Sequence, residues 1–139
     1  MKSIRRKIKQ FFSTNKPIAT DKAPKAVGPY SQGQRCTETW TTYISGQLPL
    51  NPKTGRMPET IEAQTAQSLD NLGAILEADG LSFANVVKTT VLLADINDFA
   101  AMNGVYAKYF TENLPARVCF QVAALPMGAK VEIDAIAVL

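Results

Sequence analysis

The sequence predicts one α+β domain built on a mixed sheet of about five to six strands with two helices on one face. Three observations lead to this fold class. The chain has 139 residues, which suits one domain. Its apolar patterns alternate between strand and helix in the order ββ, α, β, α, ββ. Two helices cannot cover both faces of such a sheet, so we expect a partner subunit on the second face.

The first strands are expected in the N-terminal third of the chain. Residues 23–29 are rich in Pro and Gly, so an irregular segment there would bring Tyr30 and Ser31 to a surface. Residues 40–45 are mostly β-branched or aromatic and predict a strand. The short segment of residues 34–36 could pair with it.

The first helix is predicted between Thr60, its expected N-cap, and Gly80, which would stop it. Its buried positions recur at intervals of three and four residues, at Ile61, Thr65, Leu69, Leu72 and Leu76. Residues 83–94 then predict a strand that is covered on both faces, because they are almost continuously apolar and β-favouring.

The second helix should begin near residues 95–97 and end before Leu114 and Pro115. We interpret its aromatic face as core rather than as a ligand site; that face carries Phe99, Met102, Val105, Tyr106, Tyr109 and Phe110. Residues 118–124 and 130–139 predict the last two strands. The final strand alternates apolar positions with outward ones.

Residues 1–19 are interpreted as a basic amphipathic N-terminal extension, and residues 20–139 as the domain. Six of the 15 basic residues and none of the 12 acidic residues lie in the extension, which leaves a net charge of −3 on the remainder. Four apolar residues fall on one face of a helix, at Ile4, Ile8, Phe11 and Phe12. An organelle transit peptide, a membrane-surface helix, a partner-docking helix and a solvated extension without a role are all compatible with this pattern.

Composition excludes several kinds of chemistry. The chain has no His, so Ser-His-Asp, Cys-His and H-E-x-x-H sites cannot form. Cys36 and Cys119 form no C-x-x-C pair, and no Gly spacing matches a phosphate-binding loop. We therefore expect no metal, no cofactor and a reducing compartment. No apolar stretch is long enough to span a bilayer, and the acidic domain argues against a nucleic-acid partner.

Two charged residues interrupt apolar strands and are the first candidates for a site. Arg117 follows Pro115 and Ala116, and its planar guanidinium can hold a carboxylate through two hydrogen bonds. A surface ion pair is the alternative. Glu132 is expected on a strand beside that of Arg117, where a carboxylate near an apolar pocket could orient or deprotonate a water. It could equally be a solvated outward position, like Asp134.

Four further residues have ordinary structural interpretations. Cys119 lies two residues after Arg117, so both project to one face of their strand. Without a His to activate it, Cys119 is interpreted as a small buried hydrophobe rather than a nucleophile. Tyr30, Ser45 and Asn103 could be a packing aromatic, a strand end and a helix-surface residue, and the pattern alone does not bring them together.

Five motifs follow one another along residues 20–139. They are Gly28-Pro29-Tyr30-Ser31-Gln32 after Ala23-Pro24, Ser45-Gly46-Gln47-Leu48-Pro49-Leu50, Ile61-Glu62-Ala63-Gln64-Thr65, Pro115-Ala116-Arg117, and Val122-Ala123-Ala124-Leu125-Pro126. In this order they resemble the RidA/YjgF family of reactive-intermediate deaminases. The resemblance implies a chorismate-mutase-like α+β fold and a homotrimer whose three active sites lie in clefts between subunits.

The resemblance also implies an activity, the hydrolysis of short-lived imines and enamines of the 2-aminoacrylate and 2-iminobutanoate type to 2-keto acids and ammonia. The catalytic residues would be Arg117, which holds the substrate carboxylate, Glu132, which orients the water, and Tyr30. The substrate-binding set would be Tyr30, Ser45, Asn103, Arg117 and the backbone of Cys119. A protonated imine is already electrophilic, so such a site needs positioning, a water and a proton carrier rather than a metal.

Two other classes of function stay open. An endoribonuclease or translation inhibitor would need affinity for RNA, against which the acidic domain and the absence of His argue, although the basic extension could supply it. A ligand-sensing or chaperone-like module would bind a 2-keto acid at Arg117 without turning it over. The expected location is the cytoplasm, with the mitochondrion as the alternative because of the basic N-terminus.

Overall fold

A computed structural model of the protein describes residues 16–22, 28–31, 33–35 and 40–139. The amphipathic helix expected around residues 4–12 lies outside these ranges, as does Cys36. No helix in the described part of the chain is long and apolar enough to cross a membrane.

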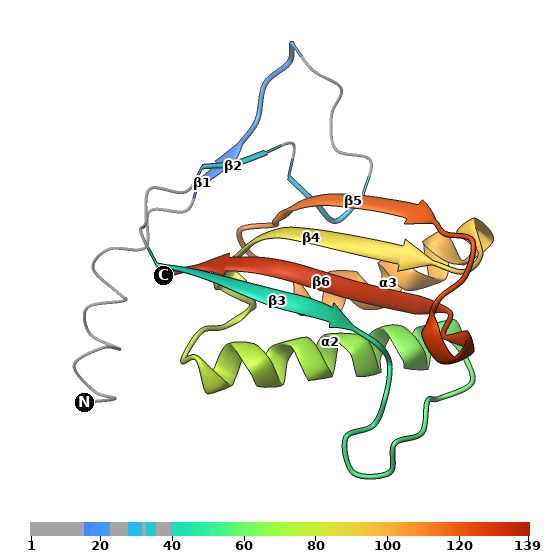
Figure 1. The fold of residues 1–139 in the computed structure, drawn as a ribbon. Helices are drawn as coiled ribbons and strands as arrows, with labels where there is room; N and C mark the ends of the chain where they lie inside the picture. The colour runs from blue at the N-terminus through green and yellow to red at the C-terminus, as the bar shows by residue number, and fades with distance from the viewer. Residues whose placement is uncertain (1–15, 23–27, 32, 36–39) are drawn as a thin grey trace.

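The main sheet has four strands in the order β3-β6-β4-β5 (Figure 1). They are β3 (Thr41–Gln47), β4 (Val86–Leu93), β5 (Ala116–Gln121) and β6 (Val131–Val138). β4 and β5 run parallel, whereas β6 is antiparallel to both β3 and β4. The predicted mixed sheet is therefore confirmed.

The predicted number of strands is wrong for the described residues, which place four rather than five to six in this sheet. The strand β2 (Gly33–Arg35) was expected to pair with the strand after it. It pairs instead with β1 (Lys16–Ile18), antiparallel, in a separate two-stranded sheet. Three residues carry too little hydrophobic pattern to specify a register or a partner, so the tertiary arrangement decides the pairing.

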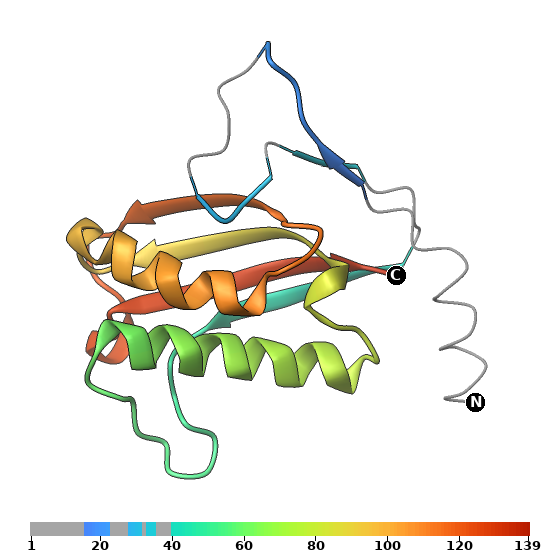
Figure 2. The same cartoon turned by 180° about the vertical axis from the view of Figure 1, so that it is seen from behind.

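Two helices lie on one face of the main sheet, as predicted (Figure 2). The helix α2 (Ile61–Ala78) begins as expected, because the Thr60 hydroxyl accepts a hydrogen bond from the Ala63 N–H over 3.2 Å. Gly80 follows its end with a φ of 71°, a conformation that favours glycine. The helix α3 spans Phe99–Tyr109. Short 3-10 turns lie at Phe83–Asn85, Ile96–Asp98 and Pro126–Gly128, the first of them replacing the predicted start of β4.

The two faces of the sheet differ in what covers them. On the helix side β6 buries Val131, Ile133, Ala135 and Ala137 in a core to which α2 and α3 also contribute. The residues of the opposite face, here called the open face, are Tyr43, Ser45, Lys88, Thr90, Leu92, Val118, Phe120, Glu132, Asp134 and Ile136.

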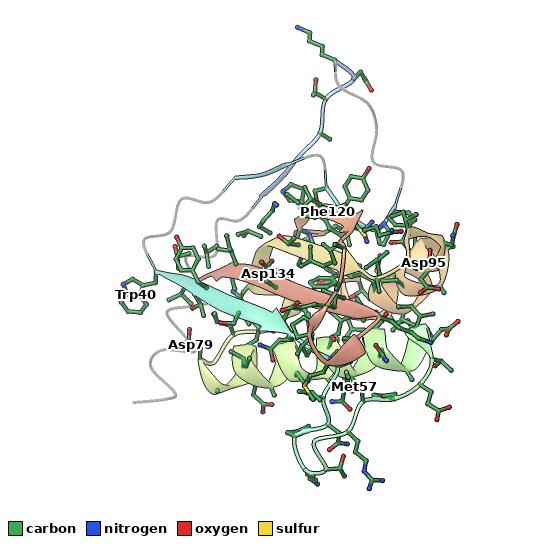
Figure 3. The ribbon with its side chains drawn as sticks, turned by 45° about the vertical axis from the view of Figure 1, so that its right-hand side comes forward. Trp40, Met57, Asp79, Asp95, Phe120 and Asp134 are labelled. Atoms are coloured by element: carbon green, nitrogen blue, oxygen red, sulfur yellow. The ribbon has the colours of Figure 1, made fainter. Side chains whose placement is uncertain are left out.

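Large apolar side chains remain accessible on the open face. Tyr43 is 77% exposed, Phe120 49% and Val118 45%. Phe120 and Asp134, which belong to this face, are labelled in Figure 3. In a single chain Lys88, Thr90 and Leu92 on the open face of β4 stay partly exposed, so the prediction that β4 is covered on both faces is met on the helix side alone.

Candidate active site

Arg117 is the second residue of β5, and its side chain lies on the helix-covered side of the sheet. Its partner in register on β4 is Thr89, whose own partner on β6 is Ala135. Thr89 and Ala135 are both buried under the helices. Because residues in register share a face, Arg117 lies on that face too. A charged group there costs free energy unless suitable partners surround it.

The Arg117 guanidinium has a hydrogen-bond partner and three aromatic neighbours. Its Nη1 donates to the side-chain oxygen of Asn103 over 2.7 Å. Its central carbon lies 5.2 Å from the ring centre of Tyr30, 5.6 Å from that of Phe99 and 4.8 Å from that of Tyr106. No carboxylate of the described residues pairs with it, so the alternative of a surface ion pair is wrong for that part of the chain. Within the same residues, no anion neutralises this cation.

Tyr30 reaches the site because its segment is tied to the start of β5. The backbone N–H of Ser31 donates to the Pro115 carbonyl over 2.9 Å, and its hydroxyl donates to the carbonyl of Leu114. Ser31 also forms an isolated parallel bridge with Ala116. These contacts give the segment a fixed position beside β5, and Tyr30 is held next to Arg117.

Gly28 leaves room for the guanidinium. A β-carbon at this position would lie 3.2 Å from Nη2 of Arg117 and 3.6 Å from the side-chain nitrogen of Asn103. The first distance is tighter than an ordinary van der Waals contact, so a side chain at position 28 would press on the arginine. The Gly-Pro-Tyr-Ser run therefore supplies both space and an aromatic ring at the same point.

One face of α3 supplies the other partners of Arg117. Phe99, Asn103 and Tyr106 are spaced by four and three residues, which places them on one side of a helix. The interpretation of the aromatic face as core is confirmed for Tyr106 and Phe110, which are buried. It was incomplete, because the rings of Phe99 and Tyr106 also border the arginine.

Tyr106 is a neutral and fixed part of this site. Its hydroxyl and that of Thr89 form a buried hydrogen bond of 2.7 Å. Burial raises the pKa of Tyr106 to about 12, although the bond to Thr89 and the charge of Arg117 act in the opposite direction. At physiological pH the phenol is therefore uncharged, and its ring lies beside the guanidinium.

Cys119 lies on the same strand face as Arg117, half-buried, and packs against the core. Burial raises the pKa of its thiol, and the nearby Arg117 charge lowers it by a smaller amount. A raised pKa keeps the thiol protonated at neutral pH. These features favour the interpretation of Cys119 as a small hydrophobe over that of a nucleophile.

Glu132 and Ser45 lie on the open face, away from the arginine. β3 has a register irregularity between Ile44 and Gln47, and Ser45 and Gly46 occupy it. The Glu132 carboxylate rests against Gly46: a β-carbon there would overlap the carboxylate oxygen and lie 2.9 Å from the carboxyl carbon. Glycine at position 46 is thus required for the observed place of this carboxylate.

Glu132 was expected on a strand beside that of Arg117, and this expectation is wrong. β4 lies between β5 and β6 in the sheet. Glu132 is in register with Leu92 and, through it, with Phe120 on the open face. In one chain the guanidinium and the carboxylate therefore point to opposite faces of the sheet.

The structure divides the predicted site residues into two groups. Tyr30, Asn103 and Arg117 come together under α3, with Cys119 two residues along the same strand face. Ser45 and Glu132 lie together on the open face. Sequence reasoning missed Phe99 and Tyr106 as partners of the arginine and overlooked the steric roles of Gly28 and Gly46. The sequence did contain signals for these residues. Phe99 and Tyr106 are aromatic residues on the same helix face as Asn103, and Gly28 and Gly46 each lie inside one of the five motifs.

No group of three or more Cys, Asp or Glu side chains capable of holding a metal ion occurs in the described part of the chain. Arg117 is instead half-buried, and its partners among the described residues are all neutral, which is typical of an arginine that binds a carboxylate or phosphate. The fold is thus that of an α+β protein, and the Arg117 group is its candidate site for a small anionic molecule.

Comparisons with known proteins identify the family. A family model described as endoribonuclease L-PSP matches residues 20–139, and the chain belongs to this family, the RidA/YjgF family that the motifs resemble. A relative from Mus musculus, named 2-iminobutanoate/2-iminopropanoate deaminase, is 55% identical over 124 residues, which cover 88% of this chain and 90% of the relative.

Two solved structures from Escherichia coli are similar to this chain. The YjgF gene product is 51% identical with a TM-score of 0.69, over 88% of this chain and 98% of the other. TdcF, solved with bound serine, is 45% identical with a TM-score of 0.69, over 89% of this chain and 98% of the other. These likenesses extend over nearly the whole of each solved chain.

Proposed function

We propose that the protein hydrolyses reactive 2-imino and 2-enamino acids, of the 2-iminobutanoate and 2-iminopropanoate type, to 2-keto acids and ammonia. The observation that carries this proposal is the Arg117 guanidinium, which is held by Asn103 and three rings with no anion of the described residues beside it. Every substrate in this class has a carboxylate for such a group to bind. The name of the mouse relative supports the same reaction.

The reaction needs three tasks from the chain. Arg117 binds the carboxylate of the substrate through its free guanidinium edge, which fixes the imine carbon in place. Glu132 orients a water and takes a proton from it as the oxygen attacks the imine carbon. Because the imine nitrogen is already protonated, this attack gives a neutral carbinolamine. Glu132 then returns the proton to the nitrogen and the C–N bond breaks, which releases ammonia. The hydroxyl group gives its own proton back to the Glu132 carboxylate as it becomes the carbonyl of the keto acid.

The remaining residues of the predicted set would shape the pocket. Tyr30 borders the arginine and could donate a hydrogen bond to the reacting groups, while Ser45 lies beside the Glu132 carboxylate. Asn103 engages Arg117, and the backbone of Cys119 continues the same strand. TdcF was solved with bound serine, a small amino acid with a carboxylate, which supports a small substrate that also has a carboxylate.

The proposed working form is a homotrimer with active sites between subunits, and nucleic acid is not among the proposed partners. Two observations support the assembly. The arginine and the carboxylate needed for one reaction lie on opposite faces of the sheet within a chain. The open face exposes Tyr43, Val118 and Phe120, an apolar surface that a second copy could bury. The Arg117 group of one copy would then meet the Glu132 group of the next.

The proposed domain organisation is an extension of residues 1–19 followed by the deaminase domain of residues 20–139. The matched range of the family model supports this boundary. The proposed location is the cytoplasm, and the basic extension makes the mitochondrion the alternative. Imaging of the full chain and of a chain lacking residues 2–19 would separate the two locations.

The test of the function is the release of ammonia or keto acid from 2-iminopropanoate or 2-iminobutanoate generated in situ. The wild type should accelerate release, and Arg117→Ala should lose about a hundredfold or more of kcat/KM, because a charged clamp is removed. Size-exclusion chromatography with light scattering would check that the variant keeps the oligomeric state of the wild type. No acceleration by the wild type would overturn the proposal.

The family model is described as endoribonuclease L-PSP, so an endoribonuclease is the alternative function to test. Cleavage of RNA by the full chain at physiological salt, undiminished in Glu132→Gln, would favour this alternative. Keto-acid binding without any turnover would favour the ligand-sensing module. Both outcomes are distinct from the acceleration expected of a deaminase.

A further inference from the structure

The hydrogen bond to Asn103 does not by itself set the orientation of the Arg117 guanidinium. An arginine side chain has several rotatable bonds, and holding it in one geometry costs rotamer entropy. The hydrogen bond from Nη1 to Asn103 fixes one edge of the guanidinium. A single bond at one edge leaves the plane free to turn about it, so something else must set the plane.

We propose that Phe99 and Tyr106 are positioning residues, whose rings hold the Arg117 guanidinium in the orientation in which it takes the substrate carboxylate. This inference rests on the proposed function and deepens it. Both rings lie within the range of about 6 Å at which cations are attracted to aromatic faces. The measured distances from the guanidinium carbon are 5.6 Å for Phe99 and 4.8 Å for Tyr106.

Tyr106 forms a support that cannot easily move. The residue is fully buried, and its hydroxyl is bonded to Thr89 on β4. Thr89 is also the register partner of Arg117 across the parallel ladder of β4 and β5. The ring is therefore attached to the strand next to the arginine as well as to α3, which fixes the distance between ring and guanidinium.

Aromatic rings suit this task better than a carboxylate. A carboxylate partner would neutralise the guanidinium and compete with the carboxylate of the substrate for the same N–H groups. Rings attract the cation through their quadrupole and leave those N–H groups free. Phe99, at the start of α3 and half-buried, is the ring of the pair that can be replaced without opening the core.

The test compares two identical substitutions. Phe99→Leu removes a ring beside the arginine. Phe83→Leu is the matched control, because Phe83 is half-buried and stacks edge-on against Tyr109 and Phe110 at 5.5 and 5.1 Å, without a contact to Arg117. Phe99→Leu should raise KM about three- to tenfold, the strength of one cation–π contact. Its kcat should stay within about twofold, because the carboxylate is bound equally in ground and transition states.

The control and the conservative variant should behave differently. Phe83→Leu should lower the melting temperature and leave KM unchanged, since it affects packing alone. Phe99→Tyr restores a ring and should restore KM, which a merely structural role for position 99 would not require. A KM in Phe99→Leu equal to that of the wild type would overturn the inference while the deaminase activity itself stood.

A second readout does not depend on turnover. In a nitrogen–proton NMR spectrum, the ε N–H signal of Arg117 should be displaced by the ring currents of its neighbours and should move toward the ordinary arginine position in Phe99→Leu. Titration of 2-oxobutanoate should give a dissociation constant about three- to tenfold weaker in Phe99→Leu and unchanged in Phe83→Leu. Binding by wild type without hydrolysis would refute the proposed function alone, and equal binding by wild type and Phe99→Leu would refute this inference.

Discussion

The surroundings of Arg117 and of Glu132 differ, although both residues lie on strands of one sheet. Arg117 is enclosed by α3 and by the segment of Tyr30, with a hydrogen-bond partner and three rings around it. Glu132 lies on the open face against a glycine, beside exposed apolar side chains. The fold of one chain therefore surrounds Arg117 with its partners. Glu132, in contrast, stays partly exposed on the sheet.

This difference bears on how the site is built. Arg117 is enclosed and has no anion beside it among the described residues, and such a cation is prepared to bind an anion before any partner arrives. A carboxylate on an open sheet face still lacks the surface that would exclude water and place a substrate against it. The division therefore predicts that the two groups fail in different ways when they are changed, and that they can be supplied by different copies.

The largest expected effect separates the chemical step from binding. Glu132→Gln should lower kcat by about a hundredfold or more with little change in KM, because the carboxylate that takes the proton is lost while the arginine clamp remains. Steady-state kinetics with in situ 2-iminobutanoate measure both constants. Asp134→Asn is the matched control, since Asp134 lies on the same face and accepts from the Thr90 N–H over 2.9 Å, a bond that Asn can keep. Equal losses in the two variants would contradict a special role for Glu132.

A mixture of two inactive variants tests whether the groups come from different copies. Arg117→Ala and Glu132→Gln chains, refolded together in equal amounts, should recover about a quarter of the wild-type activity. A site between two copies then has an intact Arg117 from one copy and an intact Glu132 from the other in about a quarter of cases. Each variant refolded alone supplies the baseline. No recovery in mixed oligomers confirmed by native mass spectrometry would place the whole site within one chain.

The steric role of Gly46 gives a smaller effect. Gly46→Ala should lower kcat/KM about tenfold, because its β-carbon would displace the Glu132 carboxylate from its present place. Gly104→Ala on α3 is the matched control: a β-carbon there meets nothing within 4 Å. That change should keep activity and stabilise the helix by about 0.5–1 kcal/mol. Unchanged activity in Gly46→Ala would show that the position of Glu132 is not critical.

The burial of Tyr106 beside Arg117 predicts a smaller, pH-dependent effect on stability. Burial raises the pKa of Tyr106 to about 12 in the folded state, above the ordinary value of 10.0. The stability that Tyr106 gains from its raised pKa is fully present below pH 10. It is lost as the pH rises toward 12, because the unfolded chain ionises first, and the free energy of unfolding should fall by about 1 kcal/mol from this residue between pH 10 and pH 11.

Denaturant unfolding of the wild type and of Tyr106→Phe at pH 8, 10 and 11 measures this contribution. At pH 8 the difference between them reports the bond to Thr89, about 1 kcal/mol. The variant should lose less stability than the wild type from pH 10 to pH 11. If the free energy of unfolding falls equally with pH in the two proteins, Tyr106 is more accessible to water than its burial indicates.

The sequence predicted well those features that depend on local pattern. The three- and four-residue spacing around Leu69 and Leu72 identified α2, and Thr60 was recognised as its N-cap. The alternation in the last strand identified β6 and separated Ile133 from Glu132 by face. The motifs identified the family, and the residues they marked fall into two spatial groups rather than being scattered.

The features that the sequence did not predict depend on contacts between distant segments. The pairing of β2 with β1, the position of β4 between β5 and β6, and the aromatic partners of Arg117 are of this kind. Side-chain alternation assigns residues to faces within one strand, but it does not say how the face of one strand corresponds to that of the next. That correspondence is fixed by the register of hydrogen bonds across the sheet.

The sequence by itself determined the class of fold, the two helices, the absence of His chemistry and the family. The tertiary structure alone decided that the cation and the carboxylate of the proposed site lie on opposite faces of the sheet, the first enclosed and the second open. The physical reason is that helices and strands follow from periodicities a few residues long, whereas strand order and register are chosen by the free energy of burying the whole core at once.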